Sequence, residues 1–278
     1  MYSRPKTLDA AVQTLAQGGG QILSGGTDFF PALSDRPAPD RVVDISGLAE
    51  ISGIAVAPHY IRIGGLTTWS QLVATTLPRS FDGLKSAARE IGGIQIQNRG
   101  TVAGNLCNAS PAADSVPPLL ALDAEIELVS AAGTRRVALA DFVVGNRKTI
   151  RRPDEILANV IVPRTVDDAP STFLKLGARR YLVISIAMVA AIVKTDDNGR
   201  VAEARIAVGS CSAVACRLKA LERTLVSVPA RPGLGAMVLA EHLSELAPID
   251  DVRATAAYRN DAALTLVARA LEACVRSC

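Results

Sequence analysis

Residues 92–114 of the chain read GGIQIQNRGTVAGNLCNASPAAD. This stretch is rich in glycine and amide side chains, yet the apolar residues Ile94, Val102 and Leu106 stand among its glycines. We therefore predict that residues 95–110 form a buried, irregular backbone. The polar groups of such a backbone need partners, and a large polar ligand would supply them. The alternative is a packed corner in which the asparagines only cap turns, and the residues alone leave both interpretations open.

A second glycine-rich motif lies nearer the N-terminus, where residues 22–29 read ILSGGTDF. A strand that ends in paired glycines can turn several consecutive N–H groups toward one point, and such a nest binds phosphate without a cationic side chain. Phosphate would repel Asp28, so we expect this residue to brace the loop or to meet a sugar hydroxyl. The motif matches neither the dinucleotide pattern G-x-G-x-x-G nor the P-loop pattern. An ordinary Gly-Gly turn is its alternative explanation.

The composition is that of a globular chain with one large domain or two modest ones. Of the 278 residues, 49% are hydrophobic, and the net charge of +3 comes from 30 basic and 27 acidic side chains. The near-neutral charge and the aromatic content of 4% argue against a nucleic-acid-binding protein. His59 and His242 are the only histidines, which leaves little for a histidine metal site or a catalytic triad. The apolar run Leu182–Val193 is too short to cross a bilayer, so we predict no membrane insertion.

The cysteines indicate the redox compartment only weakly. None of the five stands in a C-x-x-C pair, and the N-terminus lacks the apolar region of a signal peptide. We therefore expect a cytoplasmic protein with reduced thiols. Cys211 with Cys216, or Cys274 with Cys278, could hold a metal, but burial as small apolar side chains is the favoured interpretation, and we predict no metal site.

Apolar spacing and capping residues predict alternating helices and strands in the first part of the chain. The helices are Leu8–Gln17 with Thr7 as its cap, Trp69–Thr76 after Thr67 and Thr68, Asp82–Glu90, and one that opens at Asp114 and runs toward Leu122. The strands are Gln21–Ser24, Arg41–Ile45 and Tyr60–Gly64.

The pattern changes after about Pro163 to strands followed by helices. Three strands around a turn at Asp196–Gly199 predict an antiparallel sheet, and the later helices make this an α+β domain. The predicted strands are Ser171–Ala178, Ser185–Lys194 and Val201–Gly209; the helices are Cys216–Leu225, Leu234–Leu246 and about Val252–Val275, the last capped by Asp250 or Asp251.

The two glycine motifs resemble the two signatures of the flavin-binding medium subunit of molybdenum hydroxylases. That family includes xanthine dehydrogenase, carbon monoxide dehydrogenase and 4-hydroxybenzoyl-CoA reductase. The resemblance covers essentially the whole chain, because it extends from Ser24–Asp28 and Ile91–Asp114 through Pro117–Asp123, Arg147–Thr149, Asp154–Leu157, Phe173–Lys175 and Ala257–Arg259.

The resemblance implies an α+β fold with an FAD-binding PCMH-type domain over residues 1–170. This domain would consist of two α/β subdomains, about 1–57 and 58–170, that hold FAD between them. A C-terminal α+β domain over residues 171–278, with a three-stranded antiparallel sheet and helices, would close over the cofactor.

The resemblance also implies which residues bind FAD. The turn after the first strand would wrap the diphosphate, with Thr101, Ala103, Gly104 and Asn105 of the second loop also near it. Asp114 would lie near the ribityl or adenosine hydroxyls. Leu157 and Lys175 match positions close to the flavin, and Tyr181 is assigned to the ring environment, with the edge of a core strand as its alternative. The turn residues are Ile22, Leu23, Ser24, Gly25, Gly26, Thr27, Asp28 and Phe29.

The charge of Lys175 and the backbone conformation of Ala103 each have a physical consequence for a flavin site. A positive charge on Lys175 near the flavin would favour an anionic reduced form, whereas a surface ion pair is its alternative role. Ala103 stands where the family usually has the first glycine of Thr-Val-Gly-Gly-Asn. A left-handed backbone there would cost Ala about 1–2 kcal/mol, but Ala fits if the position needs only a small side chain.

The function implied by the resemblance is electron transfer within a larger enzyme. FAD would take electrons from [2Fe-2S] clusters of a small subunit and pass them to NAD+, oxygen, a quinone or another acceptor. A large molybdopterin subunit would oxidise the organic substrate, so no catalytic residue is assigned to this chain. A dimer of heterotrimers is the expected assembly.

Alternatives to this function are a freestanding FAD-dependent oxidoreductase of the same fold superfamily and a structural subunit without flavin, for which Ala103 would be an early sign. Some family members carry additional iron–sulfur ligands, which draws attention to Cys107. The sequence contains no inserted cysteine-rich loop, so we expect flavin without iron in this chain.

Overall fold

The computed structural model describes residues 1–34, 36–37 and 39–276, and the chain divides into two compact units. Each unit is built from segments that are not contiguous in the sequence. Unit 1 comprises Met1–Thr75, Gly92–Ala109 and Ala124–Pro163, and unit 2 comprises Thr76–Ile91, Ser110–Asp123 and Arg164–Cys278. The domain boundaries near residues 57 and 170 stay predictions.

Unit 1 begins with a small parallel sheet packed against helix α1. The side chain of Thr7 accepts a hydrogen bond from the N–H of Ala10, so α1 starts at the predicted residue. Its apolar face, with Val12 and Leu15, joins a core cluster that contains Val43. The sheet has the order β1-β3-β2. The elements are β1 (Tyr2–Ser3), α1 (Leu8–Gly18), β2 (Gln21–Leu23), the short helix α2 (Phe29–Leu33) and β3 (Val42–Asp44).

A five-stranded sheet with the order β4-β5-β10-β6-β7 forms the rest of the framework of unit 1. Every neighbouring pair in it is antiparallel, so the alternation of helices and strands does not produce one continuous parallel sheet. The sequence located only one of its strands, β5. The strands are β4 (Ile54–Val56), β5 (Tyr60–Gly64), β6 (Glu125–Ser130), β7 (Gly133–Ala138) and β10 (Ile156–Pro163). Around them lie η1 (Ala49–Ile51), α3 (Trp69–Ala74), α8 (Leu139–Phe142), β8 (Val143–Gly145) and β9 (Lys148–Thr149).

The expectation of an irregular backbone over residues 95–110 is wrong. Two short helices, α5 (Ile94–Arg99) and α6 (Val102–Asn108), occupy most of it. Thr101 separates them: its backbone is extended, and its side chain caps α6 by accepting from the N–H of Gly104. The glycines that suggested a loop lie at or near helix ends, where the chain turns.

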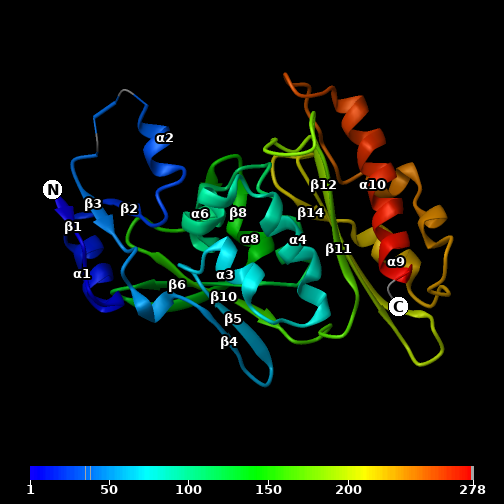
Figure 1. Cartoon of the computed structure of the whole chain (residues 1–278), viewed down its shortest axis with the longest axis horizontal. Helices are drawn as coiled ribbons and strands as arrows, with labels where there is room; N and C mark the ends of the chain where they lie inside the picture. Colours follow the sequence, from blue (N-terminus) through cyan, green and yellow to red (C-terminus); the bar gives the residue numbers. More distant parts are fainter. Residues whose placement is uncertain (35, 38, 277–278) are drawn as a thin grey trace. The chain divides into compact units, whose positions relative to one another are not determined.

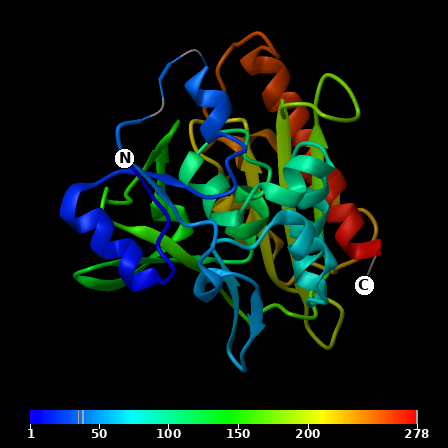
Figure 2. The same cartoon turned by 60° about the vertical axis from the view of Figure 1, so that its left-hand side comes forward.

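Unit 2 is built on an antiparallel sheet with the order β11-β12-β13-β14. The predicted three-stranded sheet is present, and β14 adds a fourth, short strand to it. Helix α10 packs on β11 and β12, and Figures 1 and 2 show it (red) along the yellow-green strands. Helix α4 contacts β11, and α7 contacts β12 and β13. The elements are η2 (Arg79–Phe81), α4 (Asp82–Glu90), α7 (Val116–Ala121), β11 (Ser171–Leu176), β12 (Ala187–Thr195), β13 (Val201–Gly209), β14 (Cys216–Arg217), α9 (Lys219–Leu225) and α10 (Ala256–Arg276).

Three predicted helices of unit 2 need correction. The helix expected over 216–225 begins only at Lys219, because the preceding residues pair with β13. The helix expected over 234–246 is replaced by two 3₁₀ turns, η3 (Leu234–Met237) and η4 (Ala240–Leu243). Close approach explains part of this: a Cβ on Gly235 would lie 2.5 Å from the carbonyl oxygen of Ala268. The last helix starts at Ala256, whose N–H donates to Asp250.

No helix among the described residues is both long enough and apolar enough to span a membrane.

Candidate functional site

The first glycine motif forms the loop that leaves β2, and its two glycines are needed for different reasons. Gly26 has a φ of +78°, in the left-handed region that favours glycine. Gly25 is constrained by space, because a Cβ there would lie 2.0 Å from the carbonyl oxygen of Arg99 and 3.2 Å from Cα of Gly100. The backbone of this loop therefore touches the backbone of the second glycine motif directly.

A side-chain contact joins the same two motifs. The hydroxyls of Ser24 and Thr101 lie 2.8 Å apart, and the Thr101 hydroxyl also accepts from the N–H of Gly104 at 3.1 Å. Both motifs belong to unit 1. The structure thus brings together the two segments that the sequence assigned to one site.

The two motifs differ in what their backbone N–H groups do. Those of Gly25 to Phe29 donate to no acceptor among the described residues. Those that open α6 are already engaged: Val102 donates to Thr67 at 3.0 Å and Ala103 donates to Gly65 at 2.9 Å, besides the bond from Gly104. Consecutive N–H groups without internal partners attract an anion. The first motif therefore offers hydrogen-bond donors to an anion, and the second motif holds the first in place.

Asp28 does not cap the helix that follows the first motif. The residue is exposed, and its side chain makes no capping hydrogen bond to α2. Its carboxylate therefore remains available to solvent or to a ligand hydroxyl.

Ala103 carries no backbone strain. It lies in the first turn of α6 with a helical backbone, so the cost of a left-handed alanine does not arise. The residue is only 6% exposed, and a Cβ on Gly65 would lie 3.0 Å from its methyl group. The position requires a small side chain, which Ala supplies.

Leu157 lies on β10 in the core of unit 1, near the start of α6. A Cβ on Gly65 would lie 2.4 Å from the carbonyl oxygen of Leu157, and Gly65 in turn accepts from Ala103. Gly65 is thus the link between two predicted site residues. The sequence placed Thr67 only at the start of the next helix and gave Gly65 no role, because nothing in their local pattern indicates a contact with α6.

Asp114 and Lys175 form an ion pair within unit 2. The Lys175 ammonium lies 2.5 Å from Oδ2 of Asp114, and the Ser185 hydroxyl donates to Oδ1 at 2.6 Å. Both ionic side chains are more than nine-tenths buried. Burial raises the pKa of Asp114, although the charge of Lys175 and its hydrogen bonds act in the opposite direction.

Lys175 does not form the surface ion pair expected as its alternative role, because its pair with Asp114 is buried. Because the carboxylate of Asp114 offsets the ammonium charge, the pair as a whole carries no net charge while Asp114 is ionised. Ser185, which completes it, was missed, since a serine before an apolar strand gives no functional signal.

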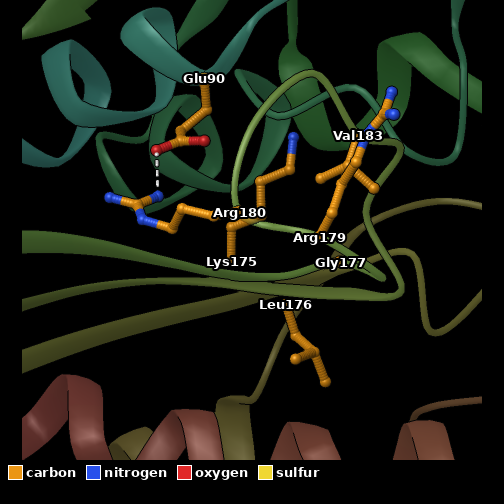
Figure 3. Close-up of a pocket in the computed structure, with 7 residues that line it drawn as sticks. All are labelled: Glu90, Lys175, Leu176, Gly177, Arg179, Arg180 and Val183. Atoms are coloured by element: carbon orange, nitrogen blue, oxygen red, sulfur yellow. Dashed lines mark hydrogen bonds and ion pairs between the residues drawn. The ribbon is translucent and has the colours of Figure 1, made fainter.

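A pocket of about 260 Å³ lies beside Lys175 within unit 2 (Figure 3). Arg180 on its rim pairs with Glu90 at 3.1 Å, and Arg179 donates from Nε to the carbonyl oxygen of Leu182 at 3.1 Å. The lining residues are Glu90, Lys175, Leu176, Gly177, Arg179, Arg180 and Val183.

Tyr181 lies in the connection between β11 and β12 and is 54% exposed. Its alternative role, as the edge of a core strand, is therefore wrong.

Among the described cysteines, Cys107 lies on α6, and Cys211 and Cys274 are buried. Cys278, the proposed partner of Cys274, is outside the described residues. No cluster of three or more His, Cys, Asp or Glu side chains suited to a metal occurs in the part of the chain that the structure describes.

The fold and the loops define a class of protein: an α+β chain with a strand–Gly-Gly loop whose free N–H groups suit a phosphorylated cofactor. Family comparison agrees. Residues 1–165 match the FAD-binding domain in molybdopterin dehydrogenase, and residues 172–274 match the CO dehydrogenase flavoprotein C-terminal domain. The chain belongs to this family of FAD-binding subunits, and its cofactor is FAD.

Relatives of known identity are similar over most of their length. A nicotinate dehydrogenase FAD-subunit from Eubacterium barkeri is 37% identical over 236 residues, which cover 82% of this chain and 80% of the relative. A xanthine dehydrogenase FAD-binding subunit from Escherichia coli O157:H7 is 34% identical, with 93% of this chain and 90% of the relative covered. Among solved structures, carbon monoxide dehydrogenase from Hydrogenophaga pseudoflava superposes with a TM-score of 0.91 at 27% identity, covering 100% of this chain and 97% of that one. The family, the fold class and the cofactor predicted from the sequence are confirmed.

Proposed function

We propose that this chain is the FAD-binding electron-transfer subunit of a molybdopterin-containing hydroxylase or dehydrogenase. When bound, FAD would relay electrons from the [2Fe-2S] clusters of a small subunit to an external acceptor. The large molybdopterin subunit would oxidise the organic substrate. The similarity to chains named as FAD subunits and medium chains of dehydrogenases supports this assignment.

The observation that carries the proposal is the contact at Gly25. A site for the FAD diphosphate needs backbone N–H groups that point outward and are not used by the fold. The loop after β2 supplies five consecutive residues, Gly25 to Phe29, whose N–H groups donate to no acceptor among the described residues. A Cβ at Gly25 would displace this loop from the backbone of Arg99, so the fit depends on glycine.

The residues of unit 1 have separable roles in this proposal. Gly25 to Phe29 bind the diphosphate, while Thr101 fixes the loop through Ser24. Ala103, Gly104 and Asn105 keep α6 close to it. The side chain of Leu157 shapes the apolar surroundings of the same region.

The site residues of unit 2 bind FAD through other parts of the cofactor. Asp114 accepts from a hydroxyl of the ribityl chain or the adenosine, and Lys175, in its ion pair with Asp114, lies near the flavin ring. Tyr181, exposed in the connection after β11, contributes to the ring environment. The proposed assembly is a cytoplasmic dimer of heterotrimers.

The flavin-less alternative loses its one supporting sign, because Ala103 is unstrained in α6.

Purification of the tagged chain from its native cells tests the assignment. The proposal predicts that a small iron–sulfur subunit and a large molybdopterin subunit co-purify, and that electrons supplied to the small subunit bleach the visible absorbance of oxidised flavin. The proposal would be refuted if the chain is purified alone with full flavin-dependent activity. It would also be refuted by a complex in which the flavin is never reduced.

Gly25→Ala and Gly47→Ala make a matched pair for this experiment. A Cβ on Gly47 would be 3.6 Å from the nearest atom, an ordinary contact with Arg4. Only the Gly25 variant should yield an assembled complex with little flavin.

A further inference from the structure

Asp251, in the segment before α10, is the partner of two arginines at once. Its Oδ1 accepts from Nη2 of Arg259 at 2.7 Å and from the N–H of Arg253 at 2.8 Å. Its Oδ2 accepts from Nη2 of Arg253 at 2.5 Å and from Nε at 3.1 Å. Hydrogen bonds from Arg253 hold the pKa of Asp251 well below its usual value, so this carboxylate is ionised.

The two arginines in turn hold two consecutive backbone carbonyls. Arg253 donates from Nη1 to Ser185 at 3.0 Å, and Arg259 donates from Nη1 to Ile186 at 2.6 Å. These carbonyls lie immediately before β12, where the chain enters the sheet. Arg259 is 1% exposed, so its orientation is set by the surrounding protein rather than by solvent. Asp251 thereby fixes a stretch of backbone far from it in sequence.

The fixed backbone carries the side chain that reaches the buried ion pair. The hydroxyl of Ser185, itself fully buried, donates to Asp114, whose other oxygen binds Lys175. Figure 3 shows Lys175 and Leu176, neighbours on β11, pointing to opposite sides, with Lys175 toward the pocket. A continuous series of hydrogen bonds therefore runs from Asp251 to the ammonium group that lines the pocket.

We propose that Asp251 is a positioning residue for Lys175. Through Arg253 and Arg259 it fixes Ser185, and the Ser185 hydroxyl holds Asp114 in the place where it binds the ammonium group. The inference deepens the proposed function and rests on it only for what Lys175 does to bound FAD. It gives a role to Arg259, which lies in one of the segments through which the chain resembles its family.

A purely structural role is the competing explanation. Arg259 also donates to the carbonyl oxygen of Ser210 at 3.0 Å, so it ties α10 to the ends of β12 and β13. Loss of that tie would lower the stability of unit 2 without changing the environment of Lys175. A readout at the lysine itself separates the two explanations.

The experiment is nuclear magnetic resonance of the full chain with ¹⁵N-labelled lysine, without FAD. The Lys175 ammonium signal is assigned by its absence in Lys175→Met. Because the ammonium is buried and hydrogen-bonded, its protons exchange slowly with water. Asp251→Asn is expected to speed this exchange about tenfold, equivalent to about 1.4 kcal/mol. Asp250→Asn removes the same charge one residue away, where the carboxylate accepts from the N–H of Ala256 and from no other donor among the described residues, and leaves the Lys175 signal unchanged.

Two further variants keep the proposal testable if Asp251→Asn does not fold. Arg253→Leu removes the bond to the Ser185 carbonyl from a side chain that is 30% exposed, and Ser185→Ala removes only the hydroxyl. Each should speed exchange at Lys175 as Asp251→Asn does. Asp251→Asn should add little in the Ser185→Ala background, because both act through one hydrogen bond.

An unchanged Lys175 signal in folded Arg253→Leu or Ser185→Ala overturns the proposal, and so do additive effects in the double variant. A subsequent titration with FAD tests the proposed function separately. A wild-type chain that fails to bind FAD refutes the function while leaving the result at Lys175 intact. If FAD binds, its reduction potential should shift in Asp251→Asn and not in Asp250→Asn.

Discussion

Substitution of Gly25 by alanine is the sharpest local perturbation of the proposed diphosphate site. The added methyl group would lie 2.0 Å from the Arg99 carbonyl oxygen and 2.8 Å from the Arg99 carbonyl carbon. The distance to the oxygen is about 1.5 Å shorter than the ordinary contact distance of non-bonded atoms. Both obstacles are backbone atoms, which no side-chain rotation can move away. The loop must therefore separate from the second glycine motif.

The size of the effect follows from the hydrogen bonds that this movement removes. An N–H bond to a charged phosphate contributes about 1.5–3 kcal/mol. Loss of one such bond weakens FAD binding by about 10- to 100-fold. Strain from the added methyl group lowers the free energy of unfolding by a further ~1–3 kcal/mol.

Quenching of FAD fluorescence on titration with the full chain measures the affinity, and urea unfolding measures the stability. Gly47→Ala is the control, since its methyl group meets only ordinary contacts. Wild-type affinity for FAD in a folded Gly25→Ala variant would refute the assignment of this loop to the diphosphate.

Three further predictions concern single side chains. Thr101→Val removes the cap of α6 and the contact with Ser24, so the free energy of unfolding in urea should fall by about 1–2 kcal/mol, whereas Thr101→Ser should retain it. Burial raises the pKa of Glu155, but the hydrogen bonds and charges of Arg135 and Arg152 together bring this pKa below the ordinary 4.5. The stabilisation is therefore complete above about pH 4.5 and lost as the pH falls toward the lower folded value, and acid unfolding of Glu155→Gln should show a flatter profile. Burial raises the pKa of Cys211 to about 11, so iodoacetamide at mildly alkaline pH should modify it only after unfolding, as read by peptide mass spectrometry. Equal stability of Thr101→Val, an unchanged acid profile, or alkylation of native Cys211 would each contradict its prediction.

Elements with strong local signals could be predicted from the sequence. Thr7 begins α1 as a capping residue, and Asp82–Glu90 forms α4 with the expected bounds. The turn at Asp196–Gly199 joins two strands, as a sequence with Asn-Gly between apolar runs predicts. In each case the residues that determine the element lie within it or directly before it.

Other elements depend on contacts with distant residues and could not be predicted. The segment 234–246 has apolar spacing typical of a helix, yet Gly235 packs against the backbone of Ala268, and the chain forms two 3₁₀ turns instead. The helices α5 and α6 are too short to give a periodic signal. Strand β14 has two residues and exists only through its pairing with β13.

The candidate site, too, has a part that local sequence signals predict and a part that depends on contacts between distant residues. The glycine motifs identified it, and they do meet in unit 1 through Gly25, Ser24 and Thr101. The sequence could not indicate that the first N–H groups of α6 are engaged by Thr67 and Gly65, because those contacts arise from tertiary packing.

Amide chemical shifts of the ¹⁵N-labelled full chain show whether the N–H groups after β2 bind the FAD diphosphate. The amide signals of Gly25 to Phe29 should shift on addition of FAD, with the largest changes at the two glycines, and those of the engaged amides Val102 and Ala103 should shift less. Binding of FAD that leaves the Gly25–Phe29 signals in place would show that the diphosphate does not bind at this loop.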